Sequence, residues 1–322
     1  MKNIALCLLL IGLLATGAAC APASAPRQTP PLEVAVLRGP TGISAAWLME
    51  EAANARANYS FHLADNPEQV VAMLSNGTVD MAALPSNLAA NLYAKTQGQM
   101  RISAIITRGA LYLLQAGDSI RNWEDLRGKT IYATGRGANP EYILYHLLMA
   151  HGLTPGLDVV VEFKNDHAEL AALLAAGQVD LAMLPEPFVT SALTQNEGIF
   201  VLFDLSEEWE ALGAGSLAMT ALVSPKDYIA ANPETIAAFL SDMELSINYA
   251  LNNVKETAVL CQKQDIIPNE AVAERAIPRC NLIFIAGEEM KGAVTPYFEV
   301  LYAADPQSVG GALPDEDFYY TR

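Results

Sequence analysis

The sequence predicts an α/β fold with two lobes, each containing a mainly parallel sheet flanked by helices. The first observation is an internal repeat, because AMLSNGTVDMAALP at 72–85 returns as ALLAAGQVDLAMLP at 172–185. The second is that short apolar runs alternate with helical patterns of about ten residues, which is typical of βαβ units. The third is the length of 322 residues, which suffices for two domains with separate cores. We interpret the repeat as one copy of the same structural unit in each lobe.

The first lobe is expected to contain three strand–helix units. In order, they are a strand at 32–37, a helix at 43–54, a strand at 59–64, a helix at 67–76, a strand at 81–85 and a helix at 87–95. The strands are short apolar runs bounded by turn residues. For the second helix, Asn66 is a good N-cap, Pro67 suits the first helical position and Gly77 can end it.

The second lobe is expected to repeat this pattern. Its elements are a strand at 129–135, a helix at 140–150, a strand at 159–163, a helix at 167–176, a strand at 181–185 and a helix from 187. Asp166 is the expected N-cap of the middle helix. Asp80 and Asp180 begin equivalent strands, whereas a ligand of an open parallel sheet lies beyond the carboxyl ends of the strands. We therefore assign both aspartates a structural role.

The N-terminal residues 1–19 have the features of a secretory signal peptide: Lys2, an apolar run and then small residues. The sequence GAAC that ends at Cys20 is similar to the lipobox of bacterial lipoproteins, so we predict a lipid on Cys20 and a Pro-rich tether at 20–31. Ordinary secretion is the alternative. No later stretch is long enough to span a membrane. The mature protein is expected to be extracytoplasmic, either lipid-anchored to the outer face of the cytoplasmic membrane or periplasmic.

Two cysteines, Cys261 and Cys280, remain in the body of the chain. In an oxidising compartment we expect a disulfide between them, which closes a loop of about 20 residues and contributes about 3 kcal/mol in the chain-entropy model. Two buried free thiols are the alternative.

The formal net charge of -17 disfavours partners that are nucleic acids or anionic membrane surfaces. Contact with the membrane is therefore expected through the lipid anchor only.

The loops at the carboxyl ends of the predicted strands are the candidate binding site. Each ends at a helix N-terminus, where free N–H groups and the helix dipole favour a polar or anionic group. The candidate residues are Pro40, Thr41, Gly42, Asn66, Ser86, Asn87, Thr134, Gly135, Arg136, Gly137, Asn139, Asp166 and Glu186. Arg136 can clamp an acid in bidentate fashion, and Glu186 can accept from an amine or ring N–H. The alternatives are that the polar residues only cap helices and that Arg136 is a solvated charge.

Several segments carry a family resemblance: LRGPTGIS, SNLAANLY, IYATGRGANPEY, AMLPEPFV and LPDEDFYY, with the repeated GxVDxAxLP and the lipobox. The chain resembles the type II periplasmic-binding-protein fold, and within it the substrate-binding lipoproteins of ABC transporters related to aliphatic-sulfonate and thiamine-pyrimidine binding proteins. The resemblance implies a monomer that delivers a solute to a permease and ATPase complex. It also implies two hinge crossovers, near 112–119 and 218–225. Lobe 1 would comprise 32–115 and 222–322, and lobe 2 would comprise 116–221.

The expected solute is small and polar or anionic, such as an aromatic heterocycle or a sulfonate. The rival class is an enzyme of the same fold, of the pyrimidine-synthase or menaquinone-pathway lyase type. The chain lacks the cysteine-rich motif of that synthase, a GxSxG elbow and metal-ligand spacing among its four histidines. We therefore expect no catalytic residue, metal or cofactor. A ligand-loaded sensor for a signalling partner is a third class, which a sensor kinase gene next to this gene would favour.

Overall fold

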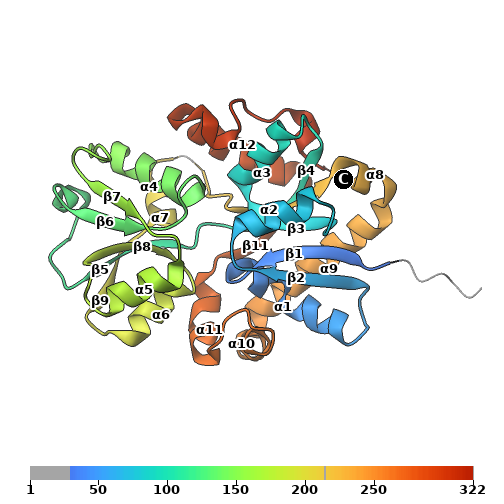
Figure 1. The fold of residues 1–322 in the computed structure, drawn as a ribbon, viewed down its shortest axis with the longest axis horizontal. Coiled ribbons are helices and arrows are strands. Elements are labelled where there is room, and N and C mark those ends of the chain that lie inside the picture. Colours follow the sequence, from blue (N-terminus) through green and yellow to red (C-terminus); the bar gives the residue numbers. More distant parts are fainter. Residues whose placement is uncertain (1–29, 214, 322) are drawn as a thin grey trace, which may run out of the picture. The chain divides into compact units, whose positions relative to one another are not determined.

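The computed structural model describes residues 30–213 and 215–321. The predicted signal peptide, Cys20 and most of the tether lie outside these residues. The described strands form two separate sheets with helices on their faces, which confirms the two-lobed α/β fold (Figure 1).

The first sheet has six strands drawn from both ends of the described chain. In the order of the sheet, they are β11 (Leu282–Ala286), β4 (Met100–Thr107), β10 (Thr220–Pro225), β3 (Met81–Pro85), β1 (Leu32–Leu37) and β2 (Tyr59–Ala64). β1 pairs in parallel with β2 and β3, whereas β10 runs antiparallel to β3 and β4, and β11 runs antiparallel to β4.

The second sheet has five strands. They are, in order, β7 (Val160–Phe163), β6 (Thr130–Ala133), β8 (Leu181–Pro185), β5 (Leu111–Ala116) and β9 (Ile199–Asp204). β6 is parallel to β7 and β8, and β5 is antiparallel to β8 and β9. Both sheets are thus mixed, although the sequence predicted mainly parallel ones.

The crossings between the sheets explain this difference. After β4 the chain passes through 108–110 and begins β5 at Leu111, which pairs with Pro185 at the carboxyl end of β8. It returns through 205–219 and begins β10 at Thr220, which pairs with Pro85 at the carboxyl end of β3. A strand that starts at this edge must run antiparallel to a strand that ends there.

These pairings correct the predicted crossover near 112–119, since Leu111–Ala116 belongs to the second sheet. We propose that the lobes divide at 108–110 and 205–219.

The helices cover both faces of the sheets. They are α1 (Pro40–Ala53), α2 (Pro67–Ser75), α3 (Ser86–Lys95), α4 (Asn139–Ala150), α5 (His167–Ala175), α6 (Phe188–Gln195), α7 (Leu205–Ala211), α8 (Lys226–Ala231), α9 (Pro233–Asn252), α10 (Val254–Lys263), α11 (Glu270–Ala276) and α12 (Gly287–Ala304). Successive side chains of β3 alternate between two cores: Met81 packs with residues of α1 and α9, and Ala82 packs with residues of α3 and α12. This alternation is the period of two expected of a strand covered on both faces. Within the described residues, no helix is both long and apolar enough to cross a membrane.

The predicted caps are confirmed. The Asn66 side chain accepts a hydrogen bond from Gln69 N (3.0 Å), and the Asp166 side chain accepts one from Glu169 N (2.7 Å). The repeat glycines follow their helices with φ of 75° at Gly77 and 67° at Gly177, the left-handed conformation that Gly adopts without strain.

The two aspartates of the repeat have different surroundings. Asp80 Oδ2 accepts from Glu33 N (3.1 Å), and Asp80 O accepts from the Ser224 hydroxyl (2.5 Å), so this residue ties β1 and β10 to the start of β3. Asp180 is exposed and uses its carbonyl oxygen to accept from Ala116 N (2.8 Å). Of these two aspartates, Asp80 alone has the contacts of a structural carboxylate among residues 30–213 and 215–321.

Cys261 and Cys280 are free and buried, in contrast to the disulfide that we predicted. Both thiols pack in the apolar core that α10 and α11 share with α1 and α9. Burial raises the pKa of Cys261 to about 12 and that of Cys280 well above its usual range. An apolar core accommodates free thiols as small hydrophobic side chains.

Candidate functional site

The loop after β1 is held by its own contacts. Pro40 occupies the first helical position of α1 after Gly39, and the Thr41 hydroxyl donates to Leu37 O and accepts from Leu37 N (both 2.8 Å). Gly42 is needed because a Cβ at this position would lie 2.8 Å from Ile266 Cγ2. These contacts fix the backbone at the edge of the first sheet.

The loops after β3 and β6 come together. Asn139 N donates to Asn87 Oδ1 (3.2 Å), Asn87 Nδ2 donates to Gly137 O (3.4 Å), and Asn139 Nδ2 donates to Ser86 Oγ (3.3 Å). We refer to Ser86, Asn87, Gly137 and Asn139 as the polar cluster. Its members come from N-terminal ends of α3 and α4, one on each side of the crossings. Thus four residues of the predicted site meet across the two lobes.

The polar cluster also bonds to the backbone at 218–219 and contains one buried oxygen without a partner among the described residues. Ser86 Oγ donates to Ala218 O (2.5 Å), and Asn139 Nδ2 donates also to Met219 O (2.8 Å). Both acceptors belong to 205–219, through which the chain returns to the first sheet and which we call the return segment. Asn139 Oδ1 is buried and has no hydrogen-bond partner in the described part of the chain. A buried amide oxygen without a donor costs about 1–3 kcal/mol, which a polar group of a ligand can offset.

The rest of the loop after β6 is divided between buried and exposed side chains. Thr134 is buried, and its hydroxyl lies 2.6 Å from His167 Nδ1. Burial lowers the pKa of His167, while Asp166 opposes this effect. Gly135 has a φ of 81°. Arg136 is exposed, and its guanidinium carbon lies 5.2 Å from the centre of the Phe163 ring.

Glu186 is fully buried at the carboxyl end of β8, and its carboxylate is already bonded. Oε2 accepts from Thr190 N (3.1 Å), and Oε1 accepts from Thr190 Oγ1 (3.0 Å) and from Arg279 Nε (3.1 Å). Arg279 precedes β11 of the other sheet and also stacks on Tyr112, 5.1 Å from the ring centre. Burial raises the pKa of Glu186, and the bonds from Thr190 and the charge of Arg279 oppose the shift. The structure thus gives Glu186 a contact between lobes that the sequence did not predict.

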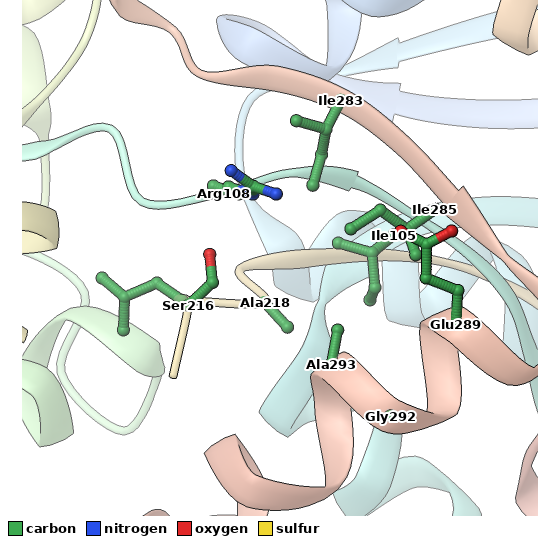
Figure 2. A pocket seen from close by; sticks show the side chains of 10 residues that line it. Ile105, Arg108, Ser216, Ala218, Ile283, Ile285, Glu289, Gly292 and Ala293 are labelled. Carbon is green, nitrogen blue, oxygen red and sulfur yellow. The ribbon is translucent and has the colours of Figure 1, made fainter. Parts of the chain in front are cut away.

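A pocket of about 360 Å³ opens beside the polar cluster (Figure 2). Its lining is mainly apolar, with Arg108, Ser216 and Glu289 as the hydrogen-bonding or charged side chains. The lining residues are Ile105, Arg108, Ser216, Leu217, Ala218, Ile283, Ile285, Glu289, Gly292 and Ala293. It adjoins the polar cluster through Ala218, whose carbonyl accepts from Ser86. The volume is within the roughly 300–1,000 Å³ of sites for small molecules.

Sequence reasoning missed the polar residues of this pocket. Arg108 directly follows β4, so an apolar run ending in Arg108 was a usable signal for a residue at the carboxyl edge. Ser216 and Glu289 carried no comparable signal. Ser216 lies in the return segment and Glu289 in α12, and neither follows a strand directly in the way that Arg108 follows β4. Among the described residues, no group of His, Cys, Asp and Glu is arranged to hold a metal ion.

Comparisons with known proteins agree with this architecture. The family model described as "NMT1/THI5 like" matches residues 61–257. YtlA of Bacillus subtilis (strain 168), named as a candidate binding protein, is 24% identical over 176 residues, which are 53% of this chain and 50% of that protein. The chain thus aligns with about half the length of this relative.

Solved structures match over most of the chain. An ABC transporter protein from Parabacteroides distasonis has a TM-score of 0.76 and 26% identity, covering 91% of this chain and 99% of that one. The periplasmic aliphatic sulphonate binding protein SsuA of Escherichia coli has a TM-score of 0.71 and 16% identity, covering 91% and 92%. The alkanesulfonate-binding SsuA of Xanthomonas axonopodis pv. citri, solved with MOPS, has a TM-score of 0.68 and 18% identity, covering 86% and 93%. At these identities the two SsuA structures establish the periplasmic-binding-protein fold alone.

Proposed function

The chain belongs to the NMT1/THI5 like family, and from this premise we propose that it is the extracytoplasmic solute-binding component of an ABC importer. Its structural relatives include an ABC transporter protein and periplasmic binding proteins, which supports a role in solute capture. The proposed solute is a small polar or anionic molecule, and the proposed partners are a permease and its ATPase.

One observation carries the proposal: loops of both lobes meet at the polar cluster, next to a pocket and next to both crossing segments. Asn87 and Asn139 bond each other across the lobes, and Ala218 of the return segment contacts both the cluster and the pocket. A site of this kind is completed only when the lobes are close together. A solute that prefers the closed arrangement will shift the population toward it.

The pair of Glu186 and Arg279 supports the same reading. It joins the edge of the second sheet to the segment before β11 of the first. Charged groups held in this way define how the lobes meet, so that closure has one preferred geometry.

The location of the protein is part of the proposal. The SsuA protein of Escherichia coli is a periplasmic binding protein, which supports export. We propose that residues 1–19 are removed as a signal peptide, that Cys20 carries the lipid and that 20–31 tether the folded body to the membrane. These residues, apart from 30 and 31, lie outside the described part of the chain.

We propose that the bound solute is released unchanged. Two of the structures that match over most of the chain are sulphonate-binding proteins, which favours capture over catalysis. A permease gene and an ATPase gene beside this gene would support import.

The test is to identify what the protein binds. Protein purified from its own host under native conditions is denatured, and the released small molecules are identified by mass spectrometry. The identified solute is then titrated into the emptied protein by calorimetry, with small-angle scattering before and after. Saturable binding with a decrease in the radius of gyration supports the proposal. Chemical conversion of the solute, or binding with no contraction, contradicts it.

As a matched control, Asn139→Ala is compared with Asn122→Ala. Asn139 belongs to the polar cluster, whereas Asn122 caps a short turn at Trp123–Leu126 of the second lobe. We expect Asn139→Ala to weaken binding of the identified solute about tenfold, the loss of roughly one hydrogen bond. Asn122→Ala should bind normally.

A further inference from the structure

The pocket beside β4 has two ends of different chemistry. Figure 2 shows Arg108 and Ser216 on one side of it and the Glu289 carboxylate on the other, with Ile105 and Ile285 between them. The register of the sheet accounts for this arrangement, because Ile285 of β11 pairs with Ile105 of β4. Arg108 follows one end of this pair of strands, and Glu289 follows the other end in the first turn of α12.

The Arg108 end offers hydrogen-bond donors. Its backbone is fixed, since Arg108 N donates to Asn281 O (2.9 Å). Within residues 30–213 and 215–321, however, the Arg108 guanidinium has no ion pair or hydrogen bond. The Ser216 hydroxyl is buried and has no partner there either. A guanidinium and a hydroxyl together suit an acidic group such as a carboxylate or a sulfonate.

The Glu289 end offers only acceptors. Glu289 is exposed toward the pocket and has no ion pair among the described residues, whereas the nearest lysine in the same helix, Lys291, is bonded to Glu316 at 2.5 Å. Glu288, its neighbour, already supplies a negative charge to the first turn of α12 and does not line the pocket. A carboxylate here attracts an ammonium group and repels a second acid.

We propose that this pocket selects an aliphatic zwitterion, a solute with an acidic group at one end, an ammonium group at the other and an apolar chain between them. The inference rests on the proposed solute-binding function and narrows its substrate class. Arg108 and Ser216 bind the acid, the side chains of Ile105, Ile283 and Ile285 contact the apolar chain, and Glu289 binds the ammonium. An alkyl acid without an ammonium group leaves the Glu289 carboxylate without a partner. The second acidic group of a dicarboxylate would be repelled by Glu289.

Calorimetric titration with defined probes tests this assignment. The probes are ω-amino carboxylates and ω-amino sulfonates in a homologous series, with alkyl acids and α,ω-dicarboxylates of the same length for comparison. We expect the ω-amino acids to bind at least tenfold more tightly than the alkyl acids, which is the effect of one charged hydrogen bond. The two series separate a carboxylate solute from a sulfonate solute.

Variants assign the two ends. Arg108→Gln should weaken binding of every acid at least tenfold. Glu289→Gln should remove the preference for the amino acid and leave the alkyl acid unaffected, and Glu289→Lys should favour the dicarboxylate. Glu288→Gln removes the same charge from the same helical turn outside the pocket, and Arg121→Gln removes an exposed arginine from the other lobe. Both controls should bind as the unaltered protein does, and melting curves confirm that all variants fold.

Some outcomes overturn the inference. It is wrong if alkyl and ω-amino acids bind equally, if no probe binds, or if Arg108→Gln and Glu289→Gln leave binding unchanged. If a co-purified solute of another class still binds and closes the protein, the zwitterion assignment fails while the proposed function stands. If no solute co-purifies and none of the probes binds, both are contradicted.

Discussion

Replacing Arg279 by Met tests whether the ion pair between the lobes stabilises the fold. The change removes the only cation that contacts the buried Glu186 carboxylate among the described residues and keeps an apolar stem against Tyr112. Removing one partner of a fully buried pair costs roughly 3–5 kcal/mol. The Arg279 side chain is 35% exposed and Thr190 retains two bonds to Glu186. We therefore expect a loss of about 2 kcal/mol in the free energy of unfolding, below the range for a fully buried pair.

The loss should depend on pH in a defined direction. Burial already raises the pKa of Glu186 above 4.5, and Arg279 opposes that shift, so its removal raises the pKa further. A group with a raised pKa in the folded state contributes stability that is complete below its unfolded pKa and is lost as the pH rises through its folded pKa. The destabilisation by Arg279→Met should thus be largest at neutral pH and smaller near about pH 5.

Urea denaturation at both pH values measures the effect. The double variant Glu186→Gln/Arg279→Met should recover most of the loss at neutral pH, because it has no buried charge. The amide oxygen of Gln can accept from Thr190 N, and its NH2 group can donate to the Thr190 hydroxyl. Arg275→Met is the control, since Arg275 lies exposed in α11, the helix just before Arg279. Equal losses at the two pH values, or no recovery in the double variant, would refute the reasoning.

Three further predictions use other parts of the chain. Cys20→Ala should release the protein from the membrane fraction, and unchanged fractionation would contradict lipidation at this residue. Cys261 and Cys280 should resist thiol reagents in the folded protein, because burial raises the pKa of both. Both should react after denaturation without reductant, and failure to react under these conditions would indicate a disulfide. Asp80→Ala should lower the free energy of unfolding by about 1–3 kcal/mol through loss of the bond to Glu33 N. Asp180→Ala should change this free energy by less than about 0.5 kcal/mol, as for an ordinary surface residue. Equal effects of the two variants in urea denaturation would contradict the different roles of the two aspartates.

Local chemistry made most elements predictable. The strands at 32–37, 59–64, 81–85 and 181–185 were predicted with the observed bounds, because their apolar runs end at Pro, Gly or polar residues. Helix starts were predictable where one side chain determines them, as with the caps Asn66 and Asp166. These features depend on neighbours within a few residues.

Which of the two sheets a strand belongs to could not be predicted from neighbouring residues. Leu111–Ala116 has an apolar pattern that suits either sheet, and its place depends on where the chain crosses. The same reason applies to the bond from Arg279 to Glu186, since the two residues are brought together by the closeness of two lobes. The pocket is assembled from β4, the return segment, β11 and α12, so no local stretch of sequence encodes it. By contrast, the rule that ligands lie beyond the carboxyl ends of strands selected both Asn87 and Asn139 as site candidates, and the structure shows that they bond each other.

We expect the short crossing at 108–110 to act as a mechanical pivot. Four Cα–Cα steps separate Thr107 from Leu111, and they span at most about 14 Å when extended, so the sheets cannot move apart there by translation. We therefore expect any opening to be a rotation about an axis near this segment, with a displacement that grows with distance from it. Spin labels on α6 and α11, which contact each other, should therefore report a large change in separation, and labels on either side of 108–110 almost none. We expect the wall of the pocket next to Arg108 to keep its shape through this rotation, and contacts further from the axis to couple binding of the solute to movement of the lobes.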